Sequence, residues 1–208
     1  MTTFFYYLEK HPLIAILRGI KPTEVVRVAE ILIEKDFKII EIPLNSTDPI
    51  RSIELLTHHF ENDAIIGAGT VLDEASIRSI AEAGAKLVVM PNGNGAVVEA
   101  AKDRDLIAIL GIATPTEAFA MIEAGADALK LFPAEGIPPV VLKAMRAVLP
   151  STVPILPVGG ITPEKMNAYQ KAGAIGFGLG SALYKPSMAH RDIRNNADAF
   201  NQALTLSL

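Results

Sequence analysis

Cysteine is absent from the 208 residues of the chain. Its absence excludes disulfides, thiolate nucleophiles and cysteine-based metal sites, and it is compatible with a cytoplasmic location. No apolar run is both long enough and free enough of charge to cross a bilayer. The segment Met1–Lys10 has no positive leader before its apolar stretch, so it predicts a short helix covering one end of a domain rather than a signal peptide.

A basic stripe and a metal-ligand spacing are also missing. The net charge is −4, which argues against a nucleic-acid surface but leaves an anionic small molecule open as a ligand. The four histidines form no ligand set and are interpreted as solvated surface residues: His11, His58, His59 and His190. Because the acidic residues also lack metal-site spacing, we expect neither a metal nor a cofactor.

Half of the residues are hydrophobic, which is enough for one sizeable core. They gather in short apolar segments that each end at or near Gly, Pro or Asn, as strands do. These predicted strands are Leu13–Leu17, Ile39–Pro43, Ala64–Ala68, Lys86–Met90, Ile107–Gly111, Ala128–Phe132, Pro154–Val158 and Ile175–Leu179.

Helix signals separate these segments. Pro22 opens one predicted helix, and Thr114 and Thr162 each place a hydroxyl cap before a first-turn proline. The sequence Ala-Gly-Ala recurs around Gly84, Gly125 and Gly173, where glycine would end a helix before the next strand. Eight β/α units predict an α/β fold, a TIM (β/α)8 barrel with an N-terminal helix, in a single domain over residues 1–208. An open doubly wound sheet is the structural alternative.

Lys130 and Glu41 are the candidate catalytic residues. Lys130 lies in the apolar strand Asp127-Ala-Leu-Lys-Leu-Phe-Pro-Ala-Glu135, and burial would favour its uncharged, nucleophilic amine. Glu41 has the matching place in Ile39-Ile-Glu-Ile-Pro43. Strand alternation turns both side chains toward the barrel axis, because the flanking leucines and isoleucines would face the helices. The alternative is a buried salt bridge that only holds the core together.

Two glycine pairs predict a phosphate site. Val158-Gly-Gly-Ile-Thr162 and Gly178-Leu-Gly-Ser-Ala182 follow the seventh and eighth strands, where such barrels commonly bind phosphate. Either pair alone could simply make a tight turn.

Three further strand ends carry candidate binding residues. Arg18 follows the first strand and could bind a substrate carboxylate or phosphate. The alternative is an ion pair with an acidic side chain on the barrel rim. Thr70, after the third strand, could bond a carboxylate or cap the next helix. Pro91 and Asn92, after the fourth, would shape a pocket wall.

Together these motifs resemble the class I aldolases that act on 2-dehydro-3-deoxy-6-phosphosugar acids, from about Pro12 to Tyr184. The resemblance rests on Glu41 in Glu-Ile-Pro-Leu-Asn-Ser46, on Gly67-Ala-Gly-Thr-Val71, on Lys130 in Lys-Leu-Phe-Pro-Ala-Glu135 and on the two glycine motifs. It implies a trimeric barrel without metal, with Lys130 as the Schiff-base lysine and Glu41 as the acid/base. The substrate-binding residues that it implies are Arg18, Thr70, Gly159, Gly160, Gly180 and Ser181. Pro91, Phe132 and Val158 complete the predicted substrate-binding set.

Two positions depart from the members that act on the gluconate epimer. Those members carry a segment similar to Glu-Val-Thr-Leu-Arg-Thr that starts at the glutamate, and they carry threonine before the Gly-Gly pair. This chain has Asn45 in place of the arginine and Val158 in place of that threonine. Both changes favour the galactonate epimer, with pyruvate and glyceraldehyde 3-phosphate as products. The gluconate or 4-hydroxy-2-oxoglutarate activity stays open, as do another phosphate-binding barrel enzyme and a non-catalytic sugar-phosphate-binding barrel.

Overall fold

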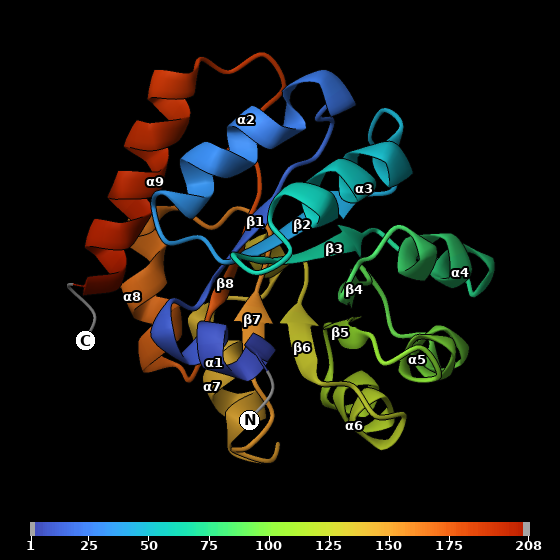
Figure 1. The fold of residues 1–208 in the computed structure, drawn as a ribbon. Coiled ribbons are helices and arrows are strands. Elements are labelled where there is room, and N and C mark those ends of the chain that lie inside the picture. Colours follow the sequence, from blue (N-terminus) through green and yellow to red (C-terminus); the bar gives the residue numbers. More distant parts are fainter. Residues whose placement is uncertain (1–2, 206–208) are drawn as a thin grey trace.

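Eight parallel strands form a barrel in the computed structural model, which describes residues 3–205 (Figure 1). The strands run in the order β7-β6-β5-β4-β3-β2-β1-β8, and a bridge between Val158 and Gly178 joins the two outermost strands. The predicted barrel is therefore confirmed, and every predicted strand is found. Their bounds are β1 Leu13–Ile16, β2 Ile39–Pro43, β3 Ile65–Gly69, β4 Leu87–Val89, β5 Ile107–Ile112, β6 Ala128–Leu131, β7 Ile155–Pro157 and β8 Phe177–Leu179.

Helices surround the barrel (Figure 1). They are α1 Thr3–Lys10, α2 Pro22–Ile33, α3 Pro49–His59, α4 Ala75–Glu82, α5 Gly95–Lys102, α6 Pro115–Glu123, α7 Pro139–Arg146, α8 Pro163–Lys171 and α9 His190–Thr205, with a 3-10 turn at Ala134–Gly136. Among residues 3–205, no helix has the length and apolar character needed to span a membrane.

The predicted helix ends are largely found. Gly84, Gly125 and Gly173 all have positive φ after α4, α6 and α8, a conformation that glycine adopts without strain. The Thr114 hydroxyl accepts a hydrogen bond from the Glu117 backbone N–H at the start of α6. Thr162 is also at an N-cap position, but its side chain makes no capping hydrogen bond, so that part of the prediction was wrong.

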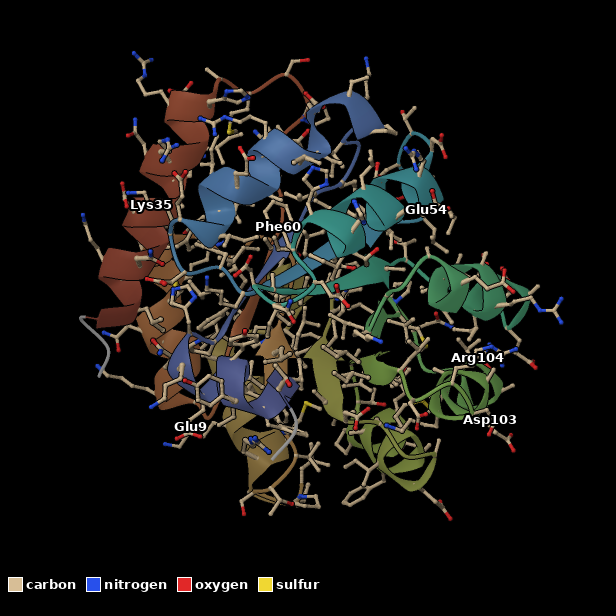
Figure 2. The ribbon with its side chains drawn as sticks, viewed as in Figure 1. Glu9, Lys35, Glu54, Phe60, Asp103 and Arg104 are labelled. Atoms are coloured by element: carbon tan, nitrogen blue, oxygen red, sulfur yellow. The ribbon has the colours of Figure 1, made fainter. Side chains whose placement is uncertain are left out.

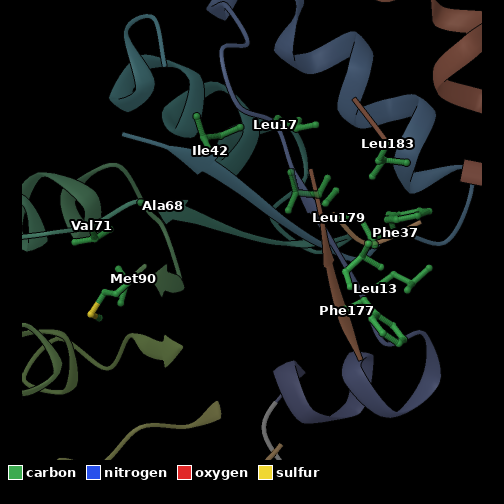
Figure 3. Close-up of a cluster of buried hydrophobic side chains, with 14 of the residues drawn as sticks. Leu13, Leu17, Phe37, Ile42, Ala68, Val71, Met90, Phe177, Leu179 and Leu183 are labelled. Atoms are coloured by element: carbon green, nitrogen blue, oxygen red, sulfur yellow. The ribbon is translucent and has the colours of Figure 1, made fainter. Parts of the chain in front are cut away.

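The strands separate two apolar layers. Leu129 and Leu131 of β6, with Ile40 and Ile42 of β2, pack outward in the core between barrel and helices. Figure 3 shows part of this outer layer around Leu179 and Phe37. The opposite faces of the same strands line the barrel interior. Strand alternation thus has the directions that the sequence predicts.

Helix α1 covers one end of the barrel, as expected. Its Phe4 and Leu8 are buried against side chains from the barrel interior. We call this set the inner cluster; it comprises Phe4, Leu8, Ile14, Ile39, Ile65, Leu87, Val89, Ile109, Ala128 and Leu156. An apolar helix at this end leaves the other end, where the strands finish, for the site.

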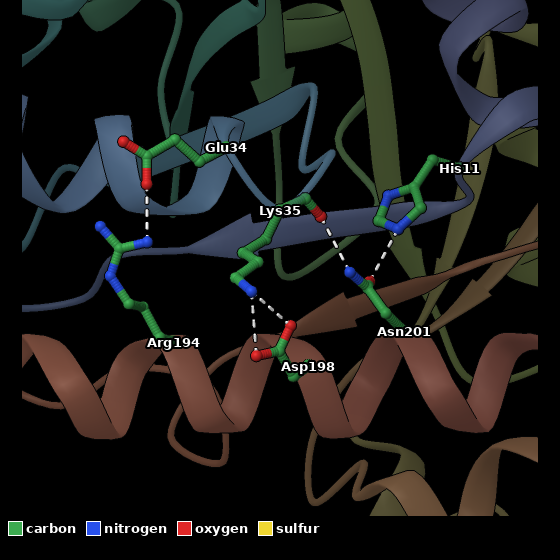
Figure 4. A network of polar contacts seen from close by, with 6 residues as sticks. All are labelled: His11, Glu34, Lys35, Arg194, Asp198 and Asn201. Atoms are coloured by element: carbon green, nitrogen blue, oxygen red, sulfur yellow. Dashed lines mark hydrogen bonds and ion pairs between the residues drawn. The ribbon is translucent and has the colours of Figure 1, made fainter.

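Charged side chains lie mainly on the outside, such as Glu9, Glu54, Asp103 and Arg104 (Figure 2). His11 is an exception to its predicted solvated role. It is half-buried, its ring meets Phe37 edge-on, and its Nε2 is 2.8 Å from Asn201 Oδ1 (Figure 4). Burial lowers its pKa. The tertiary packing of α9 covers His11, and nothing local to its sequence signals that contact.

Candidate active site

Lys130 and Glu41 lie inside the barrel. Lys130 is 4% exposed and Glu41 is 2% exposed. They line one narrow pocket, whose remaining lining residues are Ile14, Ile16, Val89, Ile109, Leu156, Val158 and Gly178. The structure therefore brings the two predicted groups together in one interior. Each is the third residue of its strand, near the C-terminal end where barrel sites occur.

Burial acts on both groups in opposite directions. It lowers the pKa of Lys130, although the Glu41 carboxylate partly raises that pKa again and Arg18 lowers it further. It raises the pKa of Glu41, against the opposing effects of Lys130 and Arg18. Both shifts favour neutral forms, an amine that can attack and a carboxyl group that can give a proton.

The ionisable pair is not a closed salt bridge. Among the ion pairs of residues 3–205, none joins Lys130 to Glu41. The Glu41 Oε2 atom is buried without a hydrogen-bond partner. Buried polar atoms are normally hydrogen-bonded, and exceptions often mark sites of chemistry. This geometry favours a reactive pair over a purely structural one.

Gly69 makes room for the Glu41 carboxylate. A Cβ at position 69 would overlap the Glu41 side chain, so any larger residue there would displace it. Sequence reasoning missed this role. The available signal was Gly67-Ala-Gly69 on the strand that pairs with the one carrying Glu41.

Phe132 and Pro91 border the same end of the barrel. The Lys130 Nζ atom lies 4.8 Å from the centroid of the Phe132 ring, a spacing at which an aromatic face attracts an ammonium. Phe132 follows β6 instead of ending it. Pro91 follows β4, and its carbonyl lies so close to Gly111 that a side chain at position 111 would collide with it.

Arg18, Asn45 and Thr70 meet just beyond the ends of β1, β2 and β3. Arg18 Nη1 donates to Asn45 Oδ1 at 2.5 Å, and Arg18 Nη2 donates to Thr70 Oγ1 at 3.3 Å. Thr70 has φ of 56°, which is unusual for a β-branched residue, and such strain often occurs at functional sites. The structure thus brings the two predicted carboxylate-binding residues, Arg18 and Thr70, into direct contact, and the Asn45 amide holds the other end of the guanidinium.

The two glycine motifs leave adjacent strands. Val158 is bridged to Gly178, so the loops after β7 and β8 start side by side. Gly159 and Gly160 have φ of 104° and 60°. Gly180 has open space on the side where a Cβ would be, and Ser181 is exposed. Such a loop before the N-terminus of α8 can direct backbone N–H groups at an anion.

Lys165 is a residue of this region that the sequence analysis did not single out. Its Nζ donates to the Gly160 carbonyl oxygen at 2.7 Å, which places a positive charge beside the glycine loop. The signal was its place in the first turn of the helix that follows the loop.

The described part of the chain, residues 3–205, contains no group of three or more His, Cys, Asp or Glu side chains arranged to hold a metal ion. His58, His59 and His190 are exposed, as predicted.

Comparisons with known proteins agree on one family. The family model for KDPG and KHG aldolase matches residues 6–198. A probable 2-dehydro-3-deoxy-6-phosphogalactonate aldolase of Rhizobium meliloti is 46% identical over 190 residues, covering 91% of this chain and 90% of the relative. The 2-dehydro-3-deoxy-6-phosphogalactonate aldolase of Escherichia coli is 42% identical over 194 residues, covering 93% and 95%. A solved structure described as native KDPGal superposes with a TM-score of 0.94 at 41% identity, covering 95% of this chain and 96% of that one.

Proposed function

The chain belongs to the KDPG and KHG aldolase family, and on that basis we propose that it is a class I aldolase. The proposed reaction cleaves 2-dehydro-3-deoxy-6-phospho-D-galactonate to pyruvate and D-glyceraldehyde 3-phosphate. The observation that carries the proposal is the burial of Lys130 beside Glu41 in one pocket of the barrel interior. The names of the two relatives support the same substrate.

Lys130 is the proposed nucleophile. Desolvation lowers the pKa of its amine, so a larger share of it is unprotonated at working pH. The amine attacks the C2 ketone and gives a carbinolamine, which loses water to form an iminium. Arg18 and Thr70 are the proposed partners of the substrate carboxylate, since both lie at the C-terminal end of the barrel.

Glu41 is the proposed acid/base. As carboxylic acid it protonates the departing hydroxyl of the carbinolamine, and as carboxylate it takes the C4 hydroxyl proton, directly or through a water. The C3–C4 electrons then move into the iminium, glyceraldehyde 3-phosphate leaves, and an enamine remains on Lys130. Protonation of the enamine at C3 and hydrolysis release pyruvate and the free amine. The raised pKa of Glu41 suits both directions of transfer.

The remaining predicted residues are proposed to hold the rest of the substrate. Gly159, Gly160, Gly180 and Ser181 would bind the phosphate through backbone N–H groups and a hydroxyl, and Phe132 and Pro91 would form apolar walls. Lys165, beside Gly160, adds positive charge at the phosphate end.

Val158 is the proposed determinant of the preferred epimer. Its side chain is 8% exposed and lines the pocket with Lys130 and Glu41. It offers no hydrogen bond to the C4 hydroxyl, whose configuration distinguishes the galactonate from the gluconate substrate. A threonine at this position would offer one.

A homotrimer in the cytoplasm completes the proposal. The family, whose resemblance implies a trimeric barrel, supports self-association. Analytical ultracentrifugation should give three times the chain mass of 22.2 kDa, and cell fractionation would test the location.

A coupled assay of pyruvate release tests the function directly. The purified protein is given the two epimeric phosphosugar acids separately, and pyruvate is followed with lactate dehydrogenase. We expect release from both, with the higher kcat/KM for the galactonate epimer. A higher value for the gluconate epimer would favour that alternative. Ligand binding without pyruvate release would favour a non-catalytic barrel.

A further inference from the structure

Asn45 accepts the shorter of the two hydrogen bonds that Arg18 donates to neighbouring side chains. It lies two residues beyond β2, between Arg18 beyond β1 and Thr70 beyond β3, and these three strands are neighbours in the barrel. Arg18 donates to Asn45 over 2.5 Å but to Thr70 over 3.3 Å. The contact with Asn45 is therefore the stronger restraint, since hydrogen bonds weaken toward the longer distance.

An exposed arginine needs such a restraint to act at a fixed place. Arg18 is exposed, and a free arginine side chain has many rotamers, whose entropy is lost when the side chain is ordered. Two acceptors that hold different nitrogens of its planar guanidinium fix both its position and its plane. Because the guanidinium is already ordered before a ligand arrives, binding does not have to pay the entropy cost of ordering it.

The neutrality of Asn45 matters as much as its position. Within residues 3–205, Arg18 takes part in no ion pair with an acidic side chain. Asn45 and Thr70 bind the guanidinium through uncharged oxygens, so they leave its full positive charge to an incoming anion. That charge acts on the reactive pair as well, because Arg18 lowers the pKa of both Lys130 and Glu41.

We propose that Asn45 is a positioning residue, which holds Arg18 at the C-terminal end of the barrel as an uncompensated cation for the carboxylate of the keto acid. The inference rests on the proposed aldolase function and adds to it a residue that contacts Arg18 instead of the reacting atoms. It distinguishes two properties of Asn45, the acceptor oxygen that holds the guanidinium and the missing negative charge.

The test uses pyruvate and acetone as paired probes of the intact enzyme. Both are methyl ketones, but only pyruvate carries a carboxylate. Each is titrated in the presence of borohydride, and mass spectrometry measures the reduced adduct at Lys130. The variants are Asn45→Ala, which removes the acceptor, and Asn45→Asp, which keeps an acceptor of the same shape and adds a negative charge. Asn62→Ala is the control, because Asn62 is exposed and precedes β3 at the opposite end of the barrel.

We expect both Asn45 variants to raise the half-saturating pyruvate concentration about tenfold or more, the effect of losing one charge-assisted hydrogen bond. Acetone trapping should fall far less than pyruvate trapping in both variants, because acetone has no carboxylate for Arg18 to bind and responds to its charge only through the pKa of Lys130. Asn62→Ala should behave as wild type with both probes.

Three results would overturn the inference. Unchanged half-saturation for pyruvate in Asn45→Ala would mean that Arg18 needs no positioning. Full rescue by Asn45→Asp would mean that only shape matters. An equal loss of acetone and pyruvate trapping would indicate general damage to the fold. If the wild-type enzyme traps neither probe, the aldolase proposal itself fails, which separates that failure from the three above.

Discussion

Ile39 and Ala128 pack beneath α1 at one end of the barrel interior, whereas Glu41 and Lys130 lie two residues further along the same two strands. The covered end consists of apolar side chains in close contact. At the other end, the two ionisable side chains are buried almost as completely as these apolar ones. All four side chains point into the barrel, so they differ only in their position along the strand. Residues near the start of the strand stabilise the barrel, and residues near its end are suited to chemistry.

The two ends also differ in their effect on stability. Burial of the inner cluster removes apolar surface from water and is favourable. At the other end, burial is the largest cause of both pKa shifts and disfavours the charged forms. One oxygen of Glu41 lacks a partner. We therefore expect the inner cluster to stabilise the fold and the reactive pair to destabilise it.

The largest effect is expected from Glu41→Gln. This change keeps the size of the side chain but removes its ability to exchange protons, so kcat should fall by about 10²–10⁴-fold, the usual contribution of a positioned acid/base. Binding should change little. Steady-state kinetics of pyruvate release would measure both, with Glu99→Gln, at an exposed position of α5, as the control. Near-normal turnover would remove Glu41 from the mechanism.

Phe4→Ala changes the covered end of the barrel and should lower stability with little effect on turnover. Phe4 is fully buried, so the cavity left behind should lower the free energy of unfolding by about 3–5 kcal/mol. Below the unfolding transition, kcat should stay close to wild type. Tyr6→Ala on the same helix is the control, since Tyr6 is 50% exposed. Urea unfolding measures the effect, and a large fall in kcat with intact stability would contradict the division between the ends.

Replacing both ionisable groups by methionine, Glu41→Met with Lys130→Met, should stabilise the protein while abolishing activity. Replacing a buried ion pair by apolar side chains is neutral or stabilising by about 1–4 kcal/mol. Changing both avoids leaving one charge buried alone.

The pH dependence of that gain follows from the two pKa directions. The pKa of Lys130 is lowered in the folded state. The free energy of unfolding gained by removing Lys130 is therefore largest below that folded pKa and disappears as the pH rises to the ordinary value of 10.5. The pKa of Glu41 is raised in the folded state. The free energy of unfolding gained by removing Glu41 is therefore largest above that folded pKa and disappears as the pH falls to the ordinary value of 4.5. Urea unfolding across this range should give the largest gain between these limits. A double variant that is less stable than wild type at every pH would contradict this account.

Val158→Thr should have the smallest effect, confined to substrate preference. The added hydroxyl can bond the C4 hydroxyl of the gluconate epimer, so the ratio of kcat/KM values should move toward gluconate by about 1–3 kcal/mol. Competition between the two epimers would measure it. Val153→Thr, outside the pocket and half-buried, is the matched control. An unchanged ratio would assign the preference to another residue.

Periodic features were predictable from the sequence, because they depend on local geometry. Strand alternation placed Glu41 and Lys130 inside the barrel, and glycine after α4, α6 and α8 marked the helix ends. Contacts between loops were not predictable. The amide of Asn45 reaches Arg18 only because β1 and β2 are neighbours and their loops bend toward each other. For the same reason the sequence predicted His11 to be solvated, although α9 packs over it.

Trapping with pyruvate and borohydride shows whether the amine of Lys130 forms an imine with the keto acid. The protein is incubated with pyruvate, reduced, digested and mapped by mass spectrometry. We expect one stable adduct on Lys130, strongly reduced in Glu41→Gln and absent from Lys130→Met. No adduct, or an adduct on a different lysine at full yield, would contradict the claim that the buried amine at position 130 forms the imine.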